Sequence, residues 1–421
     1  MFRILILIVV ISFIFIFPFD VRSEETLTWQ DCVKETAKNN PDLISAQENI
    51  KQESAAKNIT ASGLYPQVDA SADAFRAKAN SSVSNNFSYG VSASQLVFDG
   101  FKTINNVKSA SEDIKASQES YRFISSEVRL NLRTAFVSLL RAQQLIKVAE
   151  DILNIRKDNL MLITLRYESG LEHRGALLTA EANLAEAEFE LSQANREVEL
   201  AQRQLTKEMG RKEFVPMSVQ EDFVVRDEAR DKPNFDDIVK NNPSLLQAIA
   251  KKNSAAYNIK SAYGNFAPEI SGSAGADRSG SRWPPDTNQW NAGLRVSLPI
   301  FEGGLRIAEL AQAKAIYNQA AENERSVRDA AIVNLEQAWV SLQDAVETVG
   351  VQRKLLDATE ERSRIAESQF STGFITFDNW IIIENDLVSA KKAYLNSQAN
   401  SLLAEANWIQ AKGEILEYAQ K

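Results

Sequence analysis

The chain has 421 residues, a formal net charge of −9, one cysteine and one histidine. A single cysteine excludes an internal disulfide framework, and a single histidine, His173, argues against a His-based metal cluster or a Ser/His/Asp triad. The negative charge argues against nucleic acid as the main partner.

The N-terminus has the pattern of a secretory signal. Arg3 precedes an almost wholly apolar stretch over residues 4–17, and Val21-Arg22-Ser23 offers small residues at the −3 and −1 positions of a cleavage site. The sequence therefore predicts a signal peptide over residues 1–23 and a mature chain that begins near Glu24. The alternative is an uncleaved anchor, which usually needs ~20 apolar residues.

The mature sequence contains an internal duplication. Matching segments recur at an offset of 202 or 203 residues: Asn39-Asn40-Pro41 with Asn241-Asn242-Pro243, Pro66 with Pro268, Phe98–Gly100 with Phe301–Gly303, and Tyr167–Gly170 with Phe370–Gly373. This unit is far longer than a solenoid repeat, so we interpret it as a duplicated domain. We expect a first structural repeat over residues 24–215, a linker over 216–234 and a second repeat over 235–421.

Each repeat is predicted to open with two helices. A short helix over residues 29–38, or 235–240, ends at Asn-Asn-Pro. A second helix then begins at the proline, because proline at the first helical position loses no hydrogen bond. We expect this second helix to run from Pro41 to Gly63, and from Pro243 to Gly264.

Two alternating stretches follow in each repeat. Apolar and small residues occupy every second position in residues 67–74, 87–97, 270–276 and 290–300. These segments predict four strands of ~10 residues, the length that a tilted strand needs to cross a bilayer. Polar turns are expected over residues 80–86 and 277–289. The alternative is a soluble β-domain, but the apolar face is rich in Ala and Gly and the polar face is nearly uncharged.

Helix-forming sequence without proline follows Gly100 and Gly304 for more than a hundred residues. Apolar residues step by four and three, which indicates helices packed side by side over a great length. In the first repeat these are Val128, Leu132, Ala135, Leu139, Ala142, Ile146, Ala149 and Leu153. Gly170 and Gly373 are each expected to turn the chain back. The returning arms would span residues 174–210 and 375–413.

Four strands cannot close a barrel, and an open sheet edge is not tolerated in lipid. Several chains must therefore share one barrel. Two chains would give 8 strands, whose interior is filled by side chains, whereas three would give 12 strands and leave room for a pore. Both strand turns then face one side of the membrane and all helices face the other.

The ordered set of these features resembles the TolC-like outer-membrane efflux proteins over essentially the whole mature chain. The matching residues are the two Asn-Asn-Pro segments, Leu298–Gly304 after the fourth strand, and the tips Arg166–Gly170 and Gln369–Gly373. The resemblance implies a mixed α and β membrane protein, with long antiparallel helical hairpins in an α-barrel and a transmembrane β-barrel of 12 strands, four per protomer in a homotrimer. It also implies a periplasmic adaptor protein and an inner-membrane transporter as partners.

The resemblance directs attention to the hairpin tips. The family constricts the periplasmic end with inward side chains just past the second tip glycine, where the nearest carboxylate here is Asp378; a solvated surface charge is the alternative. His173 and Arg174 lie just past the first tip, as docking residues or as exposed loop residues. Tyr167 and Phe370, beside Gly170 and Gly373, are expected to be knobs that close the hairpin ends. All of these except Asp378 are candidates for adaptor docking.

The sequence thus predicts a passive exit duct of a tripartite efflux pump or type I secretion system. It would lie in the outer membrane, contact outer-membrane lipid and extend its helices into the periplasm. No phosphate-binding loop, metal cluster or nucleophile motif points to an enzyme, so we expect no catalytic residues, cofactor or metal. The alternatives are a periplasmic adaptor or a structural coiled-coil protein of the cell envelope. The transported substrate is left open.

Overall fold

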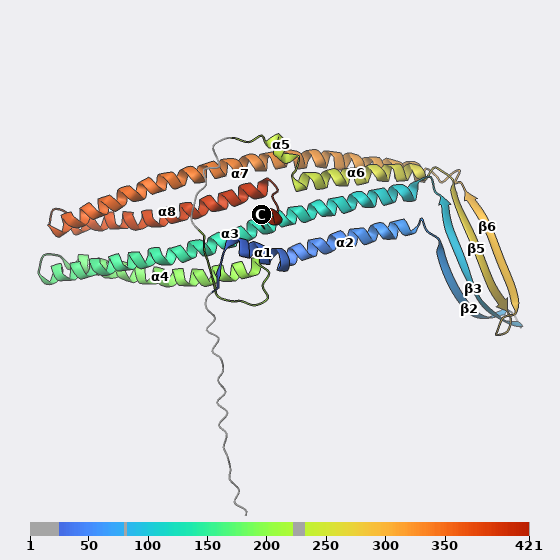
Figure 1. Cartoon of the computed structure of the whole chain (residues 1–421), viewed down its shortest axis with the longest axis horizontal. Coiled ribbons are helices and arrows are strands. Elements are labelled where there is room, and N and C mark those ends of the chain that lie inside the picture. Colours follow the sequence, from blue (N-terminus) through green and yellow to red (C-terminus); the bar gives the residue numbers. More distant parts are fainter. Residues whose placement is uncertain (1–24, 80–81, 222–231, 421) are drawn as a thin grey trace, which may run out of the picture.

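A computed structural model describes residues 25–79, 82–221 and 232–420. The expected signal peptide over residues 1–23 and the part 222–231 of the expected linker lie outside these described residues. The molecule is elongated, with the strand hairpins at one end and the tips of both long helical hairpins at the other (Figure 1). Among the described residues, no helix is both long and apolar enough to cross a membrane.

The helices form two matching sets. The first repeat contains α1 (Trp29–Asn39), α2 (Pro41–Ser62), α3 (Lys102–Glu168) and α4 (Arg174–Glu208); the second contains α5 (Phe235–Val239), α6 (Pro243–Gly264), α7 (Leu305–Ser371) and α8 (Phe377–Ala411). Corresponding long helices are equal in length, with 22 residues in α2 and α6, 67 in α3 and α7, and 35 in α4 and α8. At the standard rise, α3 and α7 are each ~100 Å long.

The Asn-Asn-Pro segments join helices end to end. The Asn40 side chain accepts hydrogen bonds from the backbone N–H groups of Asp42 and Leu43, which caps α2. The same side chain donates to the carbonyl of Glu208, the last residue of α4, at 2.9 Å. Asn242 does the same in the second repeat, where it caps α6 and donates to the carbonyl of Ala411 at 3.3 Å. Asn40 therefore connects the start of α2 to the end of α4, and Asn242 connects the start of α6 to the end of α8.

Glycine makes this junction possible. Gly210 follows α4 with φ = +74°, and a Cβ at this position would lie 2.4 Å from the carbonyl oxygen of Asn39. Gly413 is the equivalent residue after α8, with φ = +76°. Because the left-handed conformation and the close approach both exclude a side chain, the junction requires glycine.

Buried apolar residues hold the helices together in clusters along the molecule. Around mid-height, Val128, Leu132, Leu139 and Ala142 of α3 are buried with Cys32 of α1. A matching cluster in the second repeat contains Leu335, Trp339 and Leu342 of α7 and Trp408 of α8. The helix α3 packs on α2 and α4 of its own repeat and on α6 and α8 of the other, so it joins the two repeats.

The four long strands form one antiparallel sheet. They are β2 (Gln67–Ala79), β3 (Ser82–Phe98), β5 (Glu269–Gly280) and β6 (Thr287–Ser297), in the order β2-β3-β5-β6. The predicted strand ends were wrong. Asn86 pairs with Phe75 and Gln289 with Asp277, so most of both expected turns belongs to strands, whereas Ile300 lies beyond β6. Pairing satisfies the backbone of these polar residues, whatever their turn propensity.

Two further elements were not predicted. The strand β1 (Glu25–Leu27) pairs in parallel with β4 (Met217–Val219), and a 3-10 helix, η1 (Leu416–Gln420), ends the described chain. The pairing brings the start of the first repeat against the beginning of the expected linker. It covers the mid-height cluster, in which Leu27, Met217 and Val219 are buried.

Candidate functional site

The strand register separates the sheet into two faces. Direct partners in an antiparallel pair share a face, and the register places the alternating small and apolar side chains on one of them. We call this the apolar face: Val68, Ala70, Ala72, Ala74, Phe87, Tyr89, Val91, Ala93, Ile270, Gly272, Ala274, Ala276, Trp290, Ala292, Leu294 and Val296. The opposite polar face carries mainly Ser, Asn, Gln and Asp. The sheet is therefore built like a membrane-spanning wall, with one side suited to lipid and the other to water.

The sheet is open on both sides within one chain. The strands β2 and β6 are its outer members, and each pairs on one side only among the described residues. Many large side chains of the apolar face are exposed, including Trp290 at 81%. Both features require further covering, by lipid on the face and by another strand at each edge.

The first helical tip is formed by Gly170. It has φ = +69°, and the backbone N–H of Leu171 donates to the carbonyl of Arg166 at 2.8 Å, which closes the end of α3 as a Schellman motif. His173 then caps α4, because its Nδ1 accepts from the N–H of Ala176 at 3.1 Å. Arg174, the first residue of α4, is exposed.

The second tip repeats this geometry. Gly373 has φ = +80°, and the N–H of Phe374 donates to the carbonyl of Gln369 at 2.8 Å. Thr376, at the position equivalent to His173, caps α8 by accepting from the N–H of Asn379. Asp378 lies exposed in the first turn of α8, and within the described chain no cation forms an ion pair with it. The positive end of the α8 helix dipole stabilises a carboxylate at this position.

Tyr167 and Phe370 occupy equivalent positions but differ in burial. Phe370 is 1% exposed and stacks on Trp380, whereas Tyr167 is 39% exposed. The expectation that Tyr167 is a knob closing its hairpin was therefore wrong. The reason is that Phe370 lies in a tip cluster shared by both hairpins, with Ile163 of α3 and Ala176 of α4, whereas Tyr167 is not part of this cluster.

Arg166 also fastens the two tips and was missed from the sequence. Its guanidinium carbon lies 4.6 Å from the centre of the Phe370 ring, a cation–π distance, and its Nη1 donates to the Phe370 carbonyl at 3.4 Å. Glu172 lies 3.9 Å from its Nε. The only sequence signal was its place one residue before Tyr167. The two predicted tips therefore form one surface within a protomer.

Farther from the tips, buried polar side chains connect α3 with the second hairpin. Arg156 of α3 donates through Nη2 to Oδ1 of Asn385 at 2.6 Å, and Ser363 of α7 donates to Glu384 of α8 at 2.5 Å. Burial lowers the pKa of Arg156, while the carboxylate of Glu384 opposes that shift. Arg156 and Glu384 are both buried, so removal of either charge would leave the other without its nearby opposite charge.

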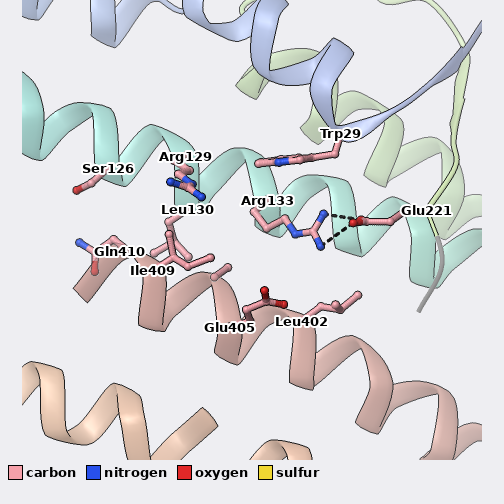
Figure 2. Close-up of a pocket in the computed structure, with 11 residues that line it drawn as sticks. Trp29, Ser126, Arg129, Leu130, Arg133, Glu221, Leu402, Glu405, Ile409 and Gln410 are labelled. Atoms are coloured by element: carbon pink, nitrogen blue, oxygen red, sulfur yellow. Dashed lines mark hydrogen bonds and ion pairs between the residues drawn. The ribbon is translucent and has the colours of Figure 1, made fainter. Parts of the chain in front are cut away.

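A cavity of about 320 Å³ lies at mid-height between α3 and α8 (Figure 2). Arg133 donates to both carboxylate oxygens of Glu221 and stands over Trp29, with its guanidinium carbon 5.0 Å from that ring centre. Arg129 pairs with Glu414 at 3.2 Å, and burial lowers its pKa. Because carboxylates neutralise both arginines, the geometry favours a junction between the repeats over a binding site.

Within residues 25–79, 82–221 and 232–420, no three His, Cys, Asp or Glu side chains are placed to hold a metal ion. What the fold offers is an elongated body with a lipid-suited sheet at one end and helical tips at the other.

Comparison of the chain with known proteins identifies its family. The family model described as "Outer membrane efflux protein" matches residues 32–211 and 235–416, which together make up most of the chain. The chain belongs to the outer membrane efflux protein family. The first matched segment contains most of α1 and all of α2 to α4, and the second contains α5 to α8.

Relatives of known name agree with this family. The chain is 24% identical over 400 residues to the outer membrane efflux protein BepC of Brucella suis biovar 1, covering 93% of this chain and 86% of BepC. It is 22% identical over 414 residues to the outer membrane protein TolC of Escherichia coli K12, covering 90% of this chain and 80% of TolC.

Solved structures share the fold. CusC aligns with a TM-score of 0.82 at 19% identity, covering 90% of this chain and 91% of that chain. The MtrE outer membrane channel of Neisseria gonorrhoeae aligns with a TM-score of 0.80 at 19% identity, covering 91% and 88%. The predicted mixed α and β channel fold is therefore confirmed.

Family membership confirms the predicted class of function and its location. The chain is an outer-membrane efflux channel, an exit duct whose helical part extends into the periplasm. The family is one of transport channels. The alternatives of a periplasmic adaptor or a structural coiled-coil protein are therefore set aside.

Proposed function

We propose that three copies of this chain assemble into one continuous passive duct, with a barrel of 12 strands in the outer membrane and an α-barrel below it. The observation that supports this most directly is the pair of unpaired sheet edges. If β6 of one protomer pairs with β2 of the next, all backbone groups in the membrane are satisfied. Three protomers of four strands each would give 12 strands and leave a wet interior.

Exposed apolar stripes on the helices support assembly along the whole length. Leu178, Phe189 and Leu200 recur every eleven residues on α4, so they share one side of that helix, and all three are exposed. The helix α7 carries its own exposed stripe at Val333, Val340, Val351 and Leu355. A neighbouring protomer would cover both stripes, because α4 and α7 are the outer arms of the two hairpins and lie on opposite sides of α3 and α8 (Figure 1).

The experiment is disulfide crosslinking between sheet edges. In a Cys32→Ala background, Ala70→Cys on β2 would be combined in turn with Ala292→Cys and Leu294→Cys on β6. At least one pair should give a ladder of covalent oligomers that ends at three chains on a denaturing gel, and the single-cysteine variants should give none. A ladder that ends at two chains, or intramolecular products alone, would overturn the trimer.

We further propose that the tips receive the transported substrate from an inner-membrane transporter through a periplasmic adaptor. Exposed Leu171 and Phe374, next to Gly170 and Gly373, support this proposal because they offer apolar contacts at the far end of the helices. Tyr167, His173 and Arg174 would line the same docking surface, His173 also through its cap of α4, and the buried Phe370 would support that surface from beneath. Asp378 would line the aperture, and the duct would carry out no reaction and bind no cofactor.

We also propose that residues 1–23 form a signal peptide that is removed before assembly, which leaves repeats over 24–215 and 235–421 joined by residues 216–234. N-terminal sequencing of protein purified from the outer membrane should begin near Glu24. Recovery of Met1 in the membrane-inserted protein would reject cleavage.

A further inference from the structure

The same cross-strand pair occurs in both strand hairpins. Arg76 of β2 pairs in register with Asn85 of β3, and Arg278 of β5 pairs with Asn288 of β6. The two arginines are 202 positions apart and the two asparagines 203, the offsets of the duplication. Both pairs lie on the apolar face, because each arginine is two residues beyond Ala74 or Ala276. The arrangement therefore persists in two copies whose sequences otherwise differ widely.

An aromatic side chain accompanies each pair. The next residues along the apolar face are Ala74 with Phe87 and Ala276 with Trp290, again at equivalent positions. Trp283, from the turn between β5 and β6, packs over this region with its ring centre 6.3 Å from that of Phe87. Aromatic side chains of this kind concentrate where the hydrocarbon of a membrane gives way to headgroups.

The charges of the sheet are sorted by face. Every charged residue on the apolar face is a cation. The polar face carries four carboxylates and one cation, so the expectation that it is nearly uncharged was wrong. The apolar-face charges are Arg76, Lys78 and Arg278, and those of the polar face are Asp69, Asp73, Glu269, Asp277 and Arg295. All three apolar-face cations lie toward the hairpin turns, at the end of the sheet opposite the helices (Figure 1). Because the helices extend into the periplasm, these cations face the outer leaflet.

The cations have no carboxylate partner in the described chain. No ion pair joins Arg76, Lys78 or Arg278 to a described acidic residue, and all three are exposed. Arg278 donates through Nε to Oδ1 of Asn288 at 2.5 Å, which holds the guanidinium against the sheet. An arginine oriented by a neutral amide keeps its full charge for an external anion, and its planar fork suits a phosphate.

We propose that each Arg–Asn pair, Arg76 with Asn85 and Arg278 with Asn288, binds the phosphate group of a lipid headgroup in the outer leaflet. The arginine would form charge-assisted hydrogen bonds to the phosphate oxygens, and Phe87 or Trp290 would pack beside the lipid. Lys78 adds charge at the first site. The proposal depends on the outer-membrane location and the sheet, and not on the number of protomers.

The experiment measures lipid retention by native mass spectrometry of the purified full-length channel. The protein would be offered equimolar lipid A, whose sugar headgroup carries phosphate, and a galactosyl diacylglycerol, whose sugar headgroup lacks it. Wild type should retain lipid A about tenfold over the neutral lipid, because charged hydrogen bonds contribute on that scale. Equal retention of both lipids would overturn the proposal.

Variants then assign the preference to the two pairs. The double variant Arg76→Gln/Arg278→Gln should lose it, so that lipid A and the neutral lipid are retained equally. The matched control is Arg295→Gln, which removes an arginine from the polar face of β6 and should leave the preference unchanged. An unchanged preference in the double variant, or an equal loss in the control, would contradict the assignment.

Two further measurements distinguish a loss of lipid binding from a failure to fold, and a lipid phosphate from free phosphate. Should the double variant fail to insert, Arg76→Lys/Arg278→Lys retains the charge without the fork and should keep only part of the preference; full retention would reject the role of the guanidinium. Adding 10 mM inorganic phosphate should not displace lipid A, whereas displacement would show that the pairs bind free phosphate. Replacing lipid A by phosphatidylglycerol tests whether a glycerophospholipid is retained equally, in which case the phosphate and not the sugar is recognised.

Discussion

Phe370 and Trp380 stack face to face, with ring centres 4.5 Å apart and ring planes within 9° of parallel. They come from the end of α7 and the start of α8, and they lie against Ile163 of α3 in the tip cluster. The pair therefore closes the second hairpin and fixes it to the first. Any movement of one tip against the other must disturb this contact.

We expect Phe370→Ala to loosen the tip. Loss of a buried phenylalanine leaves a cavity and typically costs ~3–5 kcal/mol, here confined to the end of two hairpins. Hydrogen exchange over residues 360–385 should accelerate while the sheet is unchanged. Tyr167→Ala, at the equivalent exposed position, is the control and should have little effect. Equal acceleration in both variants would mean that the stack is not what holds the tip.

We expect Asp378→Asn to reduce the cation selectivity of the channel in planar bilayers, because the proposed aperture would lose one carboxylate from each protomer. The control is Asp236→Asn. Asp236 is also the second residue of its helix and exposed, but it lies in α5 at mid-height. Both changes remove a similar favourable term at a helix start, ~0.3–1 kcal/mol. If selectivity falls equally in both variants, or in neither, Asp378 does not line the aperture.

Arg133→Met should lower the free energy of unfolding by ~2–4 kcal/mol, because it removes the bidentate hydrogen bonds to Glu221 and the cation–π contact with Trp29 at the junction between α3 and α8. The control is Arg325→Met on α7, where a strongly exposed pair with Glu322 is removed and the loss should be ~0.5 kcal/mol or less. Thermal unfolding monitored by helical circular dichroism measures both. Arg133→Lys should recover only part of the loss, since lysine cannot form the fork; full recovery would indicate that charge alone matters.

Cys32 should be chemically silent in the folded protein. It is completely buried in the mid-height cluster, and burial raises the pKa of its thiol from 9.0 to about 12. Ellman's reagent at pH 8 should label the unfolded chain only, whereas Gln47→Cys in a Cys32→Ala background should react while folded. Because the thiol pKa is higher in the folded than in the unfolded protein, the contribution of Cys32 to the free energy of unfolding is complete below pH 9. It is lost as the pH rises toward about 12. Rapid labelling of folded wild type would contradict this burial.

The long-range architecture could be predicted because it depends on repeated local signals. The duplication offset, the Asn-Asn-Pro segments and the four–three spacing each recur, and caps and packing follow from them residue by residue. Strand ends could not be predicted in the same way. Asn85 and Asn86 favour turns, yet β3 includes both, because pairing with β2 offers their backbone groups partners that local propensity does not reveal.

The tip illustrates a second limit. Tyr167 and Phe370 are equivalent by sequence, but only Phe370 is buried, since burial depends on which hairpin covers which. Arg166 contacts a residue 204 positions away, and no spacing rule brings these two together. The β1–β4 pairing, 192 positions apart at Thr26 and Ser218, was missed for the same reason.

The asparagine junctions at Asn40 and Asn242 restrict how this protein can change in size. Each one fixes where a short helix meets a returning arm, so α4 and α8 cannot lengthen without moving their tips, and α3 and α7 must follow by the same number of turns. An insertion in one copy alone would leave its tip protruding beyond the other and separate Phe370 from Arg166. Adaptation to a wider or narrower periplasm therefore requires matched, whole-turn insertions or deletions in both halves of the gene.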